Sequence, residues 1–276
     1  MTTDSIDMAV APDPAPVSSA PARRGRIMAV TSGKGGVGKT FVSANLAAAL
    51  ARRGERVLVI DADLGLANLD VVLNLFPKIT LHDVFTGKVD LEEAILPAPG
   101  GFSVLLAGSG LVEYSRLTSE VRDKLLEVIH KVAPRFDRVL LDTGAGISDV
   151  VLFAVSLADE VLLVATPEPT SLTDAYATIK VLATQQQRRA IRLVVNQTSR
   201  PGEGRAIRGQ LQQVVDRYVA PLLEPDTGSV KLDFLGEVPS DTSVRSAVQK
   251  RQLLMEMLPG CAPAQALGNI AEKLCQ

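Results

Sequence analysis

The chain has 276 residues, a formal net charge of −2 and 46% hydrophobic residues, a composition typical of a soluble globular protein. The near-neutral charge and a pI of about 5.8 argue against a broad electrostatic surface for nucleic acid, although they do not exclude a local basic patch. Cys261 and Cys275 form no CxxC pair, so the chain alone cannot build a zinc or iron–sulfur centre. It also lacks an apolar run near the ~20 residues that span a bilayer and a secretion-signal pattern, so we expect a cytoplasmic protein.

The N-terminal segment differs in composition from the rest. Residues 1–25 are rich in Pro, Ala and Ser and show no amphipathic period. Such a segment cannot bury enough apolar surface to order itself, so we predict a disordered tail. The basic cluster of Arg23, Arg24 and Arg26 is either a solvated flank or a binding site. We see no linker within residues 26–276 and predict one domain there.

From residue 26 onward, short apolar runs alternate with helical segments. Runs rich in Val, Ile and Leu, typical of strands covered on both faces, lie at residues 26–32, 56–61, 103–108, 138–143, 160–166, 191–197 and 231–238. Helices are predicted over residues 38–53, 120–133, 147–157, 170–186 and 205–220. This alternation predicts an α/β fold with a doubly wound, mostly parallel sheet and helices on both faces. The carboxyl ends of the strands would then lie along one edge.

The first predicted strand leads into a glycine-rich loop. Residues 33–40, GKGGVGKT, match the phosphate-binding pattern GxxxxGK[ST], and an Ala/Leu-rich helix follows. The glycines let backbone N–H groups turn toward phosphate oxygens without a Cβ in the way, and the helix N-terminus adds its positive end. Lys39 would reach the β- and γ-phosphates, and Thr40 would offer its hydroxyl to Mg²⁺. The predicted nucleotide-binding residues here are Gly33, Lys34, Gly35, Gly36, Val37, Gly38, Lys39, Thr40 and Phe41. The alternative is a plain strand–helix turn.

Two further predicted strands end in carboxylates. Asp61 and Asp63 lie in VIDADLG, where a carboxylate beside the phosphate loop can orient a water for in-line attack. Asp142 ends the apolar run of RVLLDTGAG, the position of a Walker B residue that holds Mg²⁺ through a water. The glycines after Asp142 allow a mobile turn that could sense the γ-phosphate. Loop-capping aspartates and a plain strand-ending turn are the alternatives.

With these motifs, residues 26–276 resemble a MinD/ParA-family ATPase with the deviant Walker A loop KGGVGKT. The resemblance implies ATP and Mg²⁺ as cofactors, and a cycle between an ADP-bound or nucleotide-free monomer and an ATP-sandwiched homodimer. It also implies that Lys34 crosses to the nucleotide of the partner subunit, where it couples dimerisation to ATP and stabilises charge during hydrolysis. The alternative is a Lys34 that serves only its own loop.

The resemblance also assigns roles to other positions. The catalytic switch I aspartate of the family matches Asp63, which could also contact Mg²⁺, and the switch II aspartate matches Asp142. The base-contacting asparagine matches Asn196 of LVVNQ, and Pro239 of EVPSD falls in the adenine-side loop. Both residue types are also common in plain turns. The predicted catalytic residues are Lys34, Lys39 and Asp63, and the predicted metal ligands are Thr40 and Asp142.

Several stretches resemble the flagellar FlhG/FleN branch of this family: DADLGLANLDVVL, LHDVFTGK, LLAGSG, DTGAG and TPEPTSLTDAYATIK. This implies control of flagellar number and placement, with a signal-recognition-type GTPase, a flagellar regulator or a flagellar building block as partner. Residues 1–25 lack the DQAxxLR-like motif with which flagellar members commonly stimulate the GTPase. Division-site placement, chromosome or cargo partitioning, a metal-cluster carrier and a non-hydrolysing module are the alternatives. The acidic pI weighs against DNA partitioning, and we expect no specific nucleic acid.

Two C-terminal segments could contact a membrane. APAQALGNIAEKLCQ places Ala266, Leu267, Ile270 and Leu274 on one face, but Lys273 is its one basic residue, and membrane-surface helices are usually richer in Lys and Arg. SVRSAVQKRQLLMEML has more positive charge and a stronger apolar stripe. Core packing and docking to a membrane or partner are both compatible with either segment, so peripheral attachment to the inner face of the plasma membrane stays one interpretation.

Overall fold

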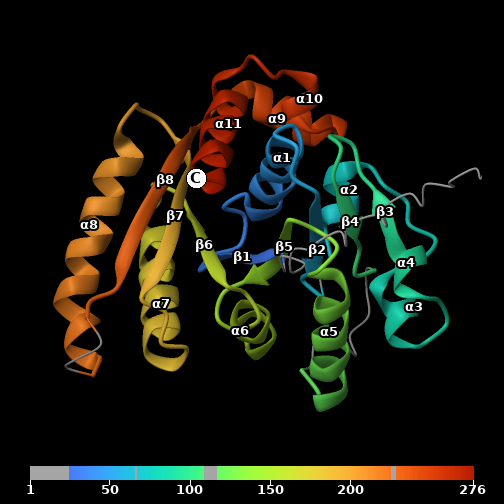
Figure 1. Cartoon of the computed structure of the whole chain (residues 1–276). Helices are drawn as coiled ribbons and strands as arrows, with labels where there is room; N and C mark the ends of the chain where they lie inside the picture. The colour runs from blue at the N-terminus through green and yellow to red at the C-terminus, as the bar shows by residue number, and fades with distance from the viewer. Residues whose placement is uncertain (1–24, 66, 109–116, 225–227) are drawn as a thin grey trace, which may run out of the picture.

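The computed structural model describes residues 25–65, 67–108, 117–224 and 228–276, and an eight-stranded sheet runs through these residues (Figure 1). The strand order is β3-β4-β2-β5-β1-β6-β7-β8. All neighbouring strands are parallel except the β3–β4 pair. The strands are β1 (Arg26–Ser32), β2 (Val57–Ala62), β3 (Ile95–Pro97), β4 (Ser103–Leu105), β5 (Arg138–Ala145), β6 (Glu160–Ala165), β7 (Ala190–Thr198) and β8 (Lys231–Pro239). The predicted doubly wound, mostly parallel sheet is confirmed.

The central strands are apolar on both sides because both faces of the sheet are covered. All six residues of β2 are buried, whereas the edge strand β8 is buried at every third position. Continuous Val/Ile/Leu runs are what a doubly covered parallel strand requires, and alternation is expected only where one face meets water. The burial pattern therefore explains why the apolar runs locate the strands so well.

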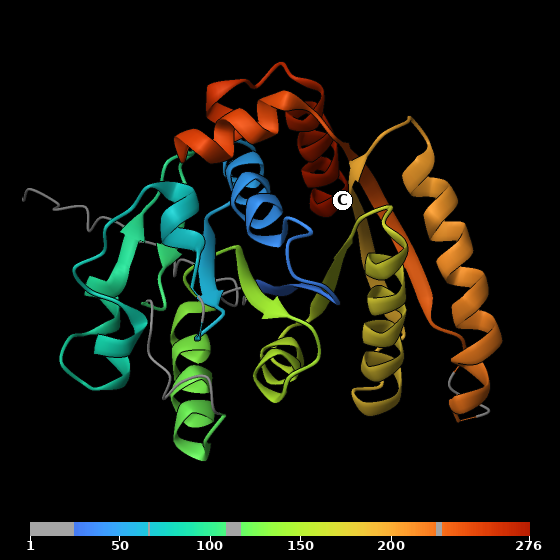
Figure 2. The same cartoon turned by 180° about the vertical axis from the view of Figure 1, so that it is seen from behind.

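Helices cover both faces of the sheet (Figures 1 and 2). One face carries α1 (Lys39–Ala51), α2 (Leu69–Leu73), α9 (Thr242–Lys250), α10 (Leu254–Met257) and α11 (Ala262–Cys275). The other carries α3 (Leu81–Phe85), α4 (Leu91–Ala94), α5 (Ser119–Val132), α6 (Asp149–Ser156), α7 (Pro169–Gln185) and α8 (Glu203–Tyr218), and a short 3-10 helix, η2 (Ala220–Leu222), follows α8. The five predicted helices correspond to α1 and α5–α8.

The helix α11 packs into the core. Leu267, Ile270 and Leu274 are buried against the layer that contains α1, while Ala266 is half-buried. The guanidinium of Arg138, at the start of β5, donates to the carbonyl oxygen of Leu274 at 2.9 Å. The apolar face of α11 is thus covered by protein, which favours the core interpretation of this segment over membrane docking. Across the described ranges, no helix is both long and apolar enough to cross a membrane.

The predicted tail lies outside the described residues except for its last residue. The backbone N–H of Gly25 donates to the carbonyl oxygen of Ala133 at 2.7 Å. A Cβ at Gly25 would lie 2.1 Å from the carbonyl oxygen of Phe136, closer than two atoms can approach. Gly25 is therefore fitted against the turn that follows α5.

Candidate nucleotide site

The phosphate loop connects β1 to α1 at the carboxyl edge of the sheet. Gly36 and Gly38 have φ of +80° and +89°, a left-handed conformation that favours glycine. A Cβ at Gly38 would also lie 2.4 Å from Nδ2 of Asn196. Gly38 is the N-cap of α1, and no side chain of the described residues caps the helix there. The first backbone N–H groups of α1 therefore remain available to an anion, which the positive end of the helix also attracts.

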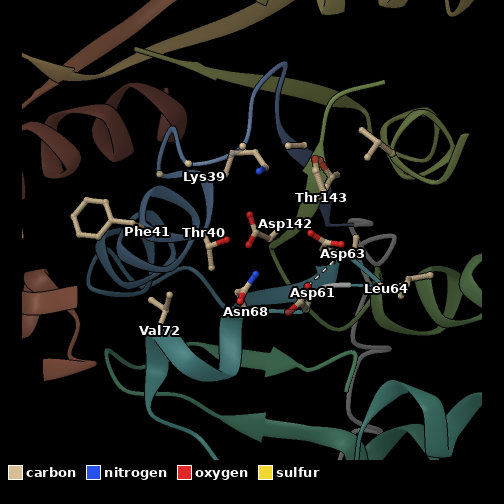
Figure 3. Close-up of a pocket in the computed structure, with 18 of the residues that line it drawn as sticks. Lys39, Thr40, Phe41, Asp61, Asp63, Leu64, Asn68, Val72, Asp142 and Thr143 are labelled. Carbon is tan, nitrogen blue, oxygen red and sulfur yellow. Dashed lines mark hydrogen bonds between the residues drawn. The ribbon is translucent and has the colours of Figure 1, made fainter. Parts of the chain in front are cut away.

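An open cavity of about 660 Å³ lies beside this loop, a volume in the range of small-molecule sites. Its wall contains Lys39 and Thr40, the carboxylates of Asp61 on β2 and Asp142 on β5, and Asp63, which follows β2 (Figure 3). The carboxylates come together because β2 and β5 are paired, with Asp61 directly opposite Asp142. Phe41, Val72 and Val248 add apolar side chains to the lining of the cavity. The cavity thus joins a phosphate-type cradle to an acidic wall.

Asp142 lies against two hydroxyl groups of α1. The Oγ of Ser43 donates to Oδ1 of Asp142 at 2.8 Å, and the hydroxyl of Thr40 lies on the side of the cavity that faces this carboxylate (Figure 3). Burial raises the pKa of Asp142, while these two hydroxyls and the charge of Lys39 act in the opposite direction. With a hydroxyl donor bonded to it and the charge of Lys39 nearby, the buried Asp142 carboxylate is prepared to stay ionised when a metal ion binds beside it.

Asp61 holds the chain that follows β2. Its Oδ1 accepts from the backbone N–H of Asp63 at 3.1 Å, and its Oδ2 accepts from that of Leu69 at 3.2 Å. Burial, followed by the negative charge of Asp142, raises the pKa of Asp61 well above its ordinary value. Asp63 itself is half-buried and lines the cavity. Asp61 therefore fixes the start of this loop, and Asp63 is the member of the pair placed to contact a ligand.

Lys34 points away from the cavity of its own chain. Its Nζ lies 2.7 Å from Oε2 of Glu168 and 2.8 Å from Oγ1 of Thr170, both at the start of α7. Lys34 is not among the residues that line the cavity, although the neighbouring Gly35 and Gly36 are. Two lysines of one loop are thus separated: Lys39 lies at the cavity and Lys34 at α7.

Asn196 lies near the end of β7 and Pro239 at the end of β8, and neither residue lines the cavity. The Nδ2 of Asn196, which is 5% exposed, donates to the carbonyl oxygen of Val37 at 2.8 Å. Pro239 is half-buried and is paired with Thr198 in the sheet. In this structure Asn196 supports the phosphate loop, and contacts of Asn196 and Pro239 with a base stay predictions.

Some residues of the site have only a weak sequence signal, or none. Ser43 lies one turn after Thr40, on the same face of α1, so its spacing could have identified it. Glu168 lies in a stretch that shows the family resemblance, but nothing in the sequence connects it to Lys34. Val248 reaches the cavity from a helix about two hundred residues further along the chain, and only tertiary folding brings it there.

The donor set fits Mg²⁺ held together with a phosphate ligand. Thr40 and Asp142 offer hydroxyl and carboxylate oxygens, the ligand type that Mg²⁺ prefers. No group of three or more His, Cys, Asp or Glu residues within the described part of the chain is arranged to hold a metal alone. Mg²⁺ commonly uses one or two protein ligands and completes its shell with phosphate oxygens and waters. The site therefore suits a metal that arrives with a nucleotide.

A glycine-rich loop between a buried parallel strand and an uncapped helix, facing carboxylates from two neighbouring strands, defines a phosphate-loop nucleotide-binding protein. The sequence model of the CobQ/CobB/MinD/ParA nucleotide binding domain matches residues 28–254. The antiactivator FleN of Pseudomonas aeruginosa is 42% identical over 249 residues, which are 90% of this chain and 86% of FleN. The flagellum site-determining protein YlxH of Helicobacter pylori is 33% identical over 248 residues, or 89% of this chain and 80% of YlxH.

A solved structure agrees with these sequence relatives. The septum site-determining protein MinD of Pyrococcus horikoshii, complexed with Mg-ADP, has a TM-score of 0.70 and 30% identity, and the match covers 90% of this chain and 95% of that protein. The chain therefore belongs to the CobQ/CobB/MinD/ParA family and is a MinD-like ATPase within it. The resemblance seen in the sequence is confirmed, including that to flagellar members.

Proposed function

We propose that this chain binds Mg-ATP, hydrolyses it slowly, and cycles between a monomer with ADP or no nucleotide and a dimer with ATP between the subunits, to control flagellar number and placement. The observation that carries the proposal is the meeting of the uncapped start of α1, Lys39, Asp63 and Asp142 at one cavity. A glycine-rich turn without catalytic function would need none of these side chains at the same edge.

In the proposed site the backbone N–H groups of the loop bind phosphate oxygens, and Lys39 binds the β- and γ-phosphates. Thr40 and Asp142 would hold Mg²⁺, which neutralises phosphate charge when bound. Asp142 would do so through a water, because Mg²⁺ gives up its hydration reluctantly. These groups position the nucleotide, which is most of what a phosphoryl-transfer site must do.

Hydrolysis would then depend on Asp63 and on Lys34 of a second copy of the chain. Asp63 lines the cavity on the side of β5, where a carboxylate can orient the attacking water. Lys34 does not reach its own cavity in this structure, which supports a role outside its own site. Released from Glu168 and Thr170, its ammonium group would supply positive charge to the γ-phosphate bound by the partner.

The flagellar role is proposed from the relatives. An antiactivator and a flagellum site-determining protein match nearly the whole chain. A flagellar regulator, a flagellar building block or a signal-recognition-type GTPase is the proposed partner class, and division-site or partitioning roles are the alternatives. Of the two C-terminal segments, residues 243–258 are the better candidate for a peripheral membrane contact, because Val248 and Leu258 are exposed there.

Two measurements test this function. Sizing by light scattering should show a monomer with ADP and a dimer with Mg-ATP. The rate of phosphate release per subunit should rise with protein concentration, because only the dimer turns over. A strain that lacks the chain should have an altered number or position of flagella, and the Asp63→Ala variant should fail to restore them. Normal flagella in that strain would reject the flagellar role while leaving the ATPase intact, whereas absent Mg-ATP binding would reject both.

A further inference from the structure

Ser43 is a hydroxyl buried inside a helix made largely of Ala and Leu. It is fully buried in α1, where a hydroxyl is costly unless it has a hydrogen-bond partner. In helices such a hydroxyl usually donates to the carbonyl oxygen one turn earlier. Thr173, Thr178 and Thr184 of α7 all do this, to the carbonyl oxygens of the residues four positions before them.

Ser43 donates instead to a different element. A serine hydroxyl has one proton to donate, and that of Ser43 goes to Oδ1 of Asp142 at 2.8 Å. Asp142 lies on β5, 99 residues further along the chain. This bond connects the first turns of α1, which directly follow the phosphate loop, to a carboxylate within β5.

The hydroxyl of Thr40 also faces the Asp142 carboxylate, and both residues line the cavity (Figure 3). Thr40 and Ser43 are three residues apart, so they lie on one face of α1 and both face β5. With Oδ1 fixed by a residue that lies too deep to contact a ligand, the carboxylate cannot rotate freely about its terminal torsion. Asp142 itself lines the cavity together with Thr40, so this constraint acts on a carboxylate that a ligand can reach.

From this arrangement we infer that Ser43 is a positioning residue for the metal: it orients the Asp142 carboxylate so that nucleotide binding depends on Mg²⁺. The inference rests on the proposed function, because it concerns the same site. Groups that orient metal ligands in this way contribute strongly to metal affinity, and their loss typically lowers it about 10- to 100-fold. The other role for Ser43 would be structural, to satisfy a buried hydroxyl and stabilise α1.

The experiment measures the affinity of the full chain for fluorescent N-methylanthraniloyl-ADP while MgCl₂ is titrated from an EDTA baseline. For Ser43→Ala we expect the Mg²⁺ concentration at half-effect to rise about tenfold, with little change in the affinity measured in EDTA. Ser43→Cys keeps a weak donor and should fall between Ser43→Ala and wild type. Thr178→Val removes a buried hydroxyl that bonds only within α7, and it should match wild type in both measurements.

A Ser43→Ala variant that is less stable to heat but has the wild-type Mg²⁺ dependence would make Ser43 structural and overturn the inference. Equal losses of affinity in EDTA and in Mg²⁺ would overturn it too, since Ser43 would then support the loop rather than the metal. If wild type itself shows no effect of Mg²⁺ on binding of the fluorescent ADP, the proposed function fails before the variants are compared.

Discussion

At the scale of single residues, the main contrast is between the two lysines of the phosphate loop. Lys39 faces the cavity and the carboxylates, while Lys34 forms an ion pair with Glu168. The pair is largely exposed to solvent, and such pairs contribute little to stability. It can therefore be given up easily when a stronger anion, such as a triphosphate bound by a second subunit, competes for the ammonium group.

Replacement of Lys39 by alanine should strongly weaken nucleotide binding. A charge-assisted contact to phosphate is worth about 1.5–3 kcal/mol, so we expect affinity for Mg-ATP to fall at least about 10- to 100-fold. Isothermal titration calorimetry would measure it, with Lys231→Ala, an exposed lysine on the edge strand β8, as the control. Wild-type affinity in the Lys39→Ala variant would contradict the assignment of the phosphate loop.

At the scale of elements, the sequence predicts the long helices and the long strands well. Each predicted helix matches α1 or α5–α8 within about two residues. The helices α5 and α8 bury one face and so show a helical period, whereas α1 is buried over ten consecutive residues and is recognised by its length and its Ala/Leu content. The elements between β2 and β4 were not predicted. They are three to five residues long, too short to show a period, and β3 depends on a partner strand rather than on its own residues.

The candidate site was predictable in part for a related reason. Residues that follow the carboxyl end of a strand can be placed from sequence, because parallel strands end at one edge. Ser43, Glu168 and Val248 contact the site from helix interiors and distant segments. Their contacts depend on packing between elements, and the amide orientation of Asn196 depends on the final path of the loop. Such details are set by tertiary structure.

The raised pKa of Asp61, which holds the loop after β2, predicts how stability depends on pH. In the folded chain the pKa of Asp61 is raised by burial, so its neutral form is favoured by folding and its contribution to stability is largest below about pH 4. This contribution is lost as pH rises through the raised pKa. The Asp61→Asn variant cannot titrate at this position. We therefore compare the free energy of unfolding of wild type with that of the variant. The difference, wild type minus variant, should decrease as pH rises, by at most about 1.4 kcal/mol per pH unit.

Thermal or urea unfolding of the nucleotide-free protein between pH 5 and 8 would measure this slope. Comparison with the variant cancels the opposite trend of carboxylates such as Asp137, whose pKa is lowered by hydrogen bonds from Arg56. Asn also replaces the Oδ2 that accepts from Leu69 with a donor, a loss that should be independent of pH. A difference between wild type and variant that stays constant from pH 5 to 8 would show that Asp61 does not titrate in this range.

The two ends of the chain should respond differently to deletion. Residues 1–24 are poor in the apolar periodicity that ordered segments need, so their removal should leave the thermal midpoint and basal ATPase unchanged. Removal of residues 261–276 takes away Leu267, Ile270 and Leu274, each worth about 1.5–3 kcal/mol when buried. That sum is comparable to the 5–15 kcal/mol that stabilises a whole domain, so this variant should not fold, as circular dichroism would show.

At the scale of the whole molecule, the proposed dimer separates the roles of Lys34 and Asp63. Lys34→Ala should still bind ATP, because the loop and Lys39 are intact, but it should lose ATP-dependent dimerisation and turnover. Asp63→Ala should bind ATP and remain a stable dimer, because the water is no longer oriented and the γ-phosphate that holds the subunits together persists. Light scattering with ADP and with ATP, beside a phosphate-release assay, distinguishes the two variants.

A mixture of the two variants provides the sharper test. In a heterodimer the Asp63→Ala subunit supplies an intact Lys34 to the other subunit, whose own Asp63 is intact, so one of the two sites should regain turnover. Differently tagged subunits would prove that heterodimers are present. If such heterodimers stay inactive, or if Lys34→Ala dimerises normally with ATP, Lys34 does not act across the interface.

The covering of α1 by α11 also has a consequence during synthesis. The helix that carries the phosphate loop is complete at Ala51, but the helix that packs on it begins at Ala262. At about 5–20 residues per second, the apolar side of α1 stays uncovered on the ribosome for roughly 10–40 s. A nascent chain in this interval has its nucleotide loop but lacks the layer that holds it in place. In the proposed dimer, ATP could therefore begin to pair newly made subunits only after α11 has been synthesised.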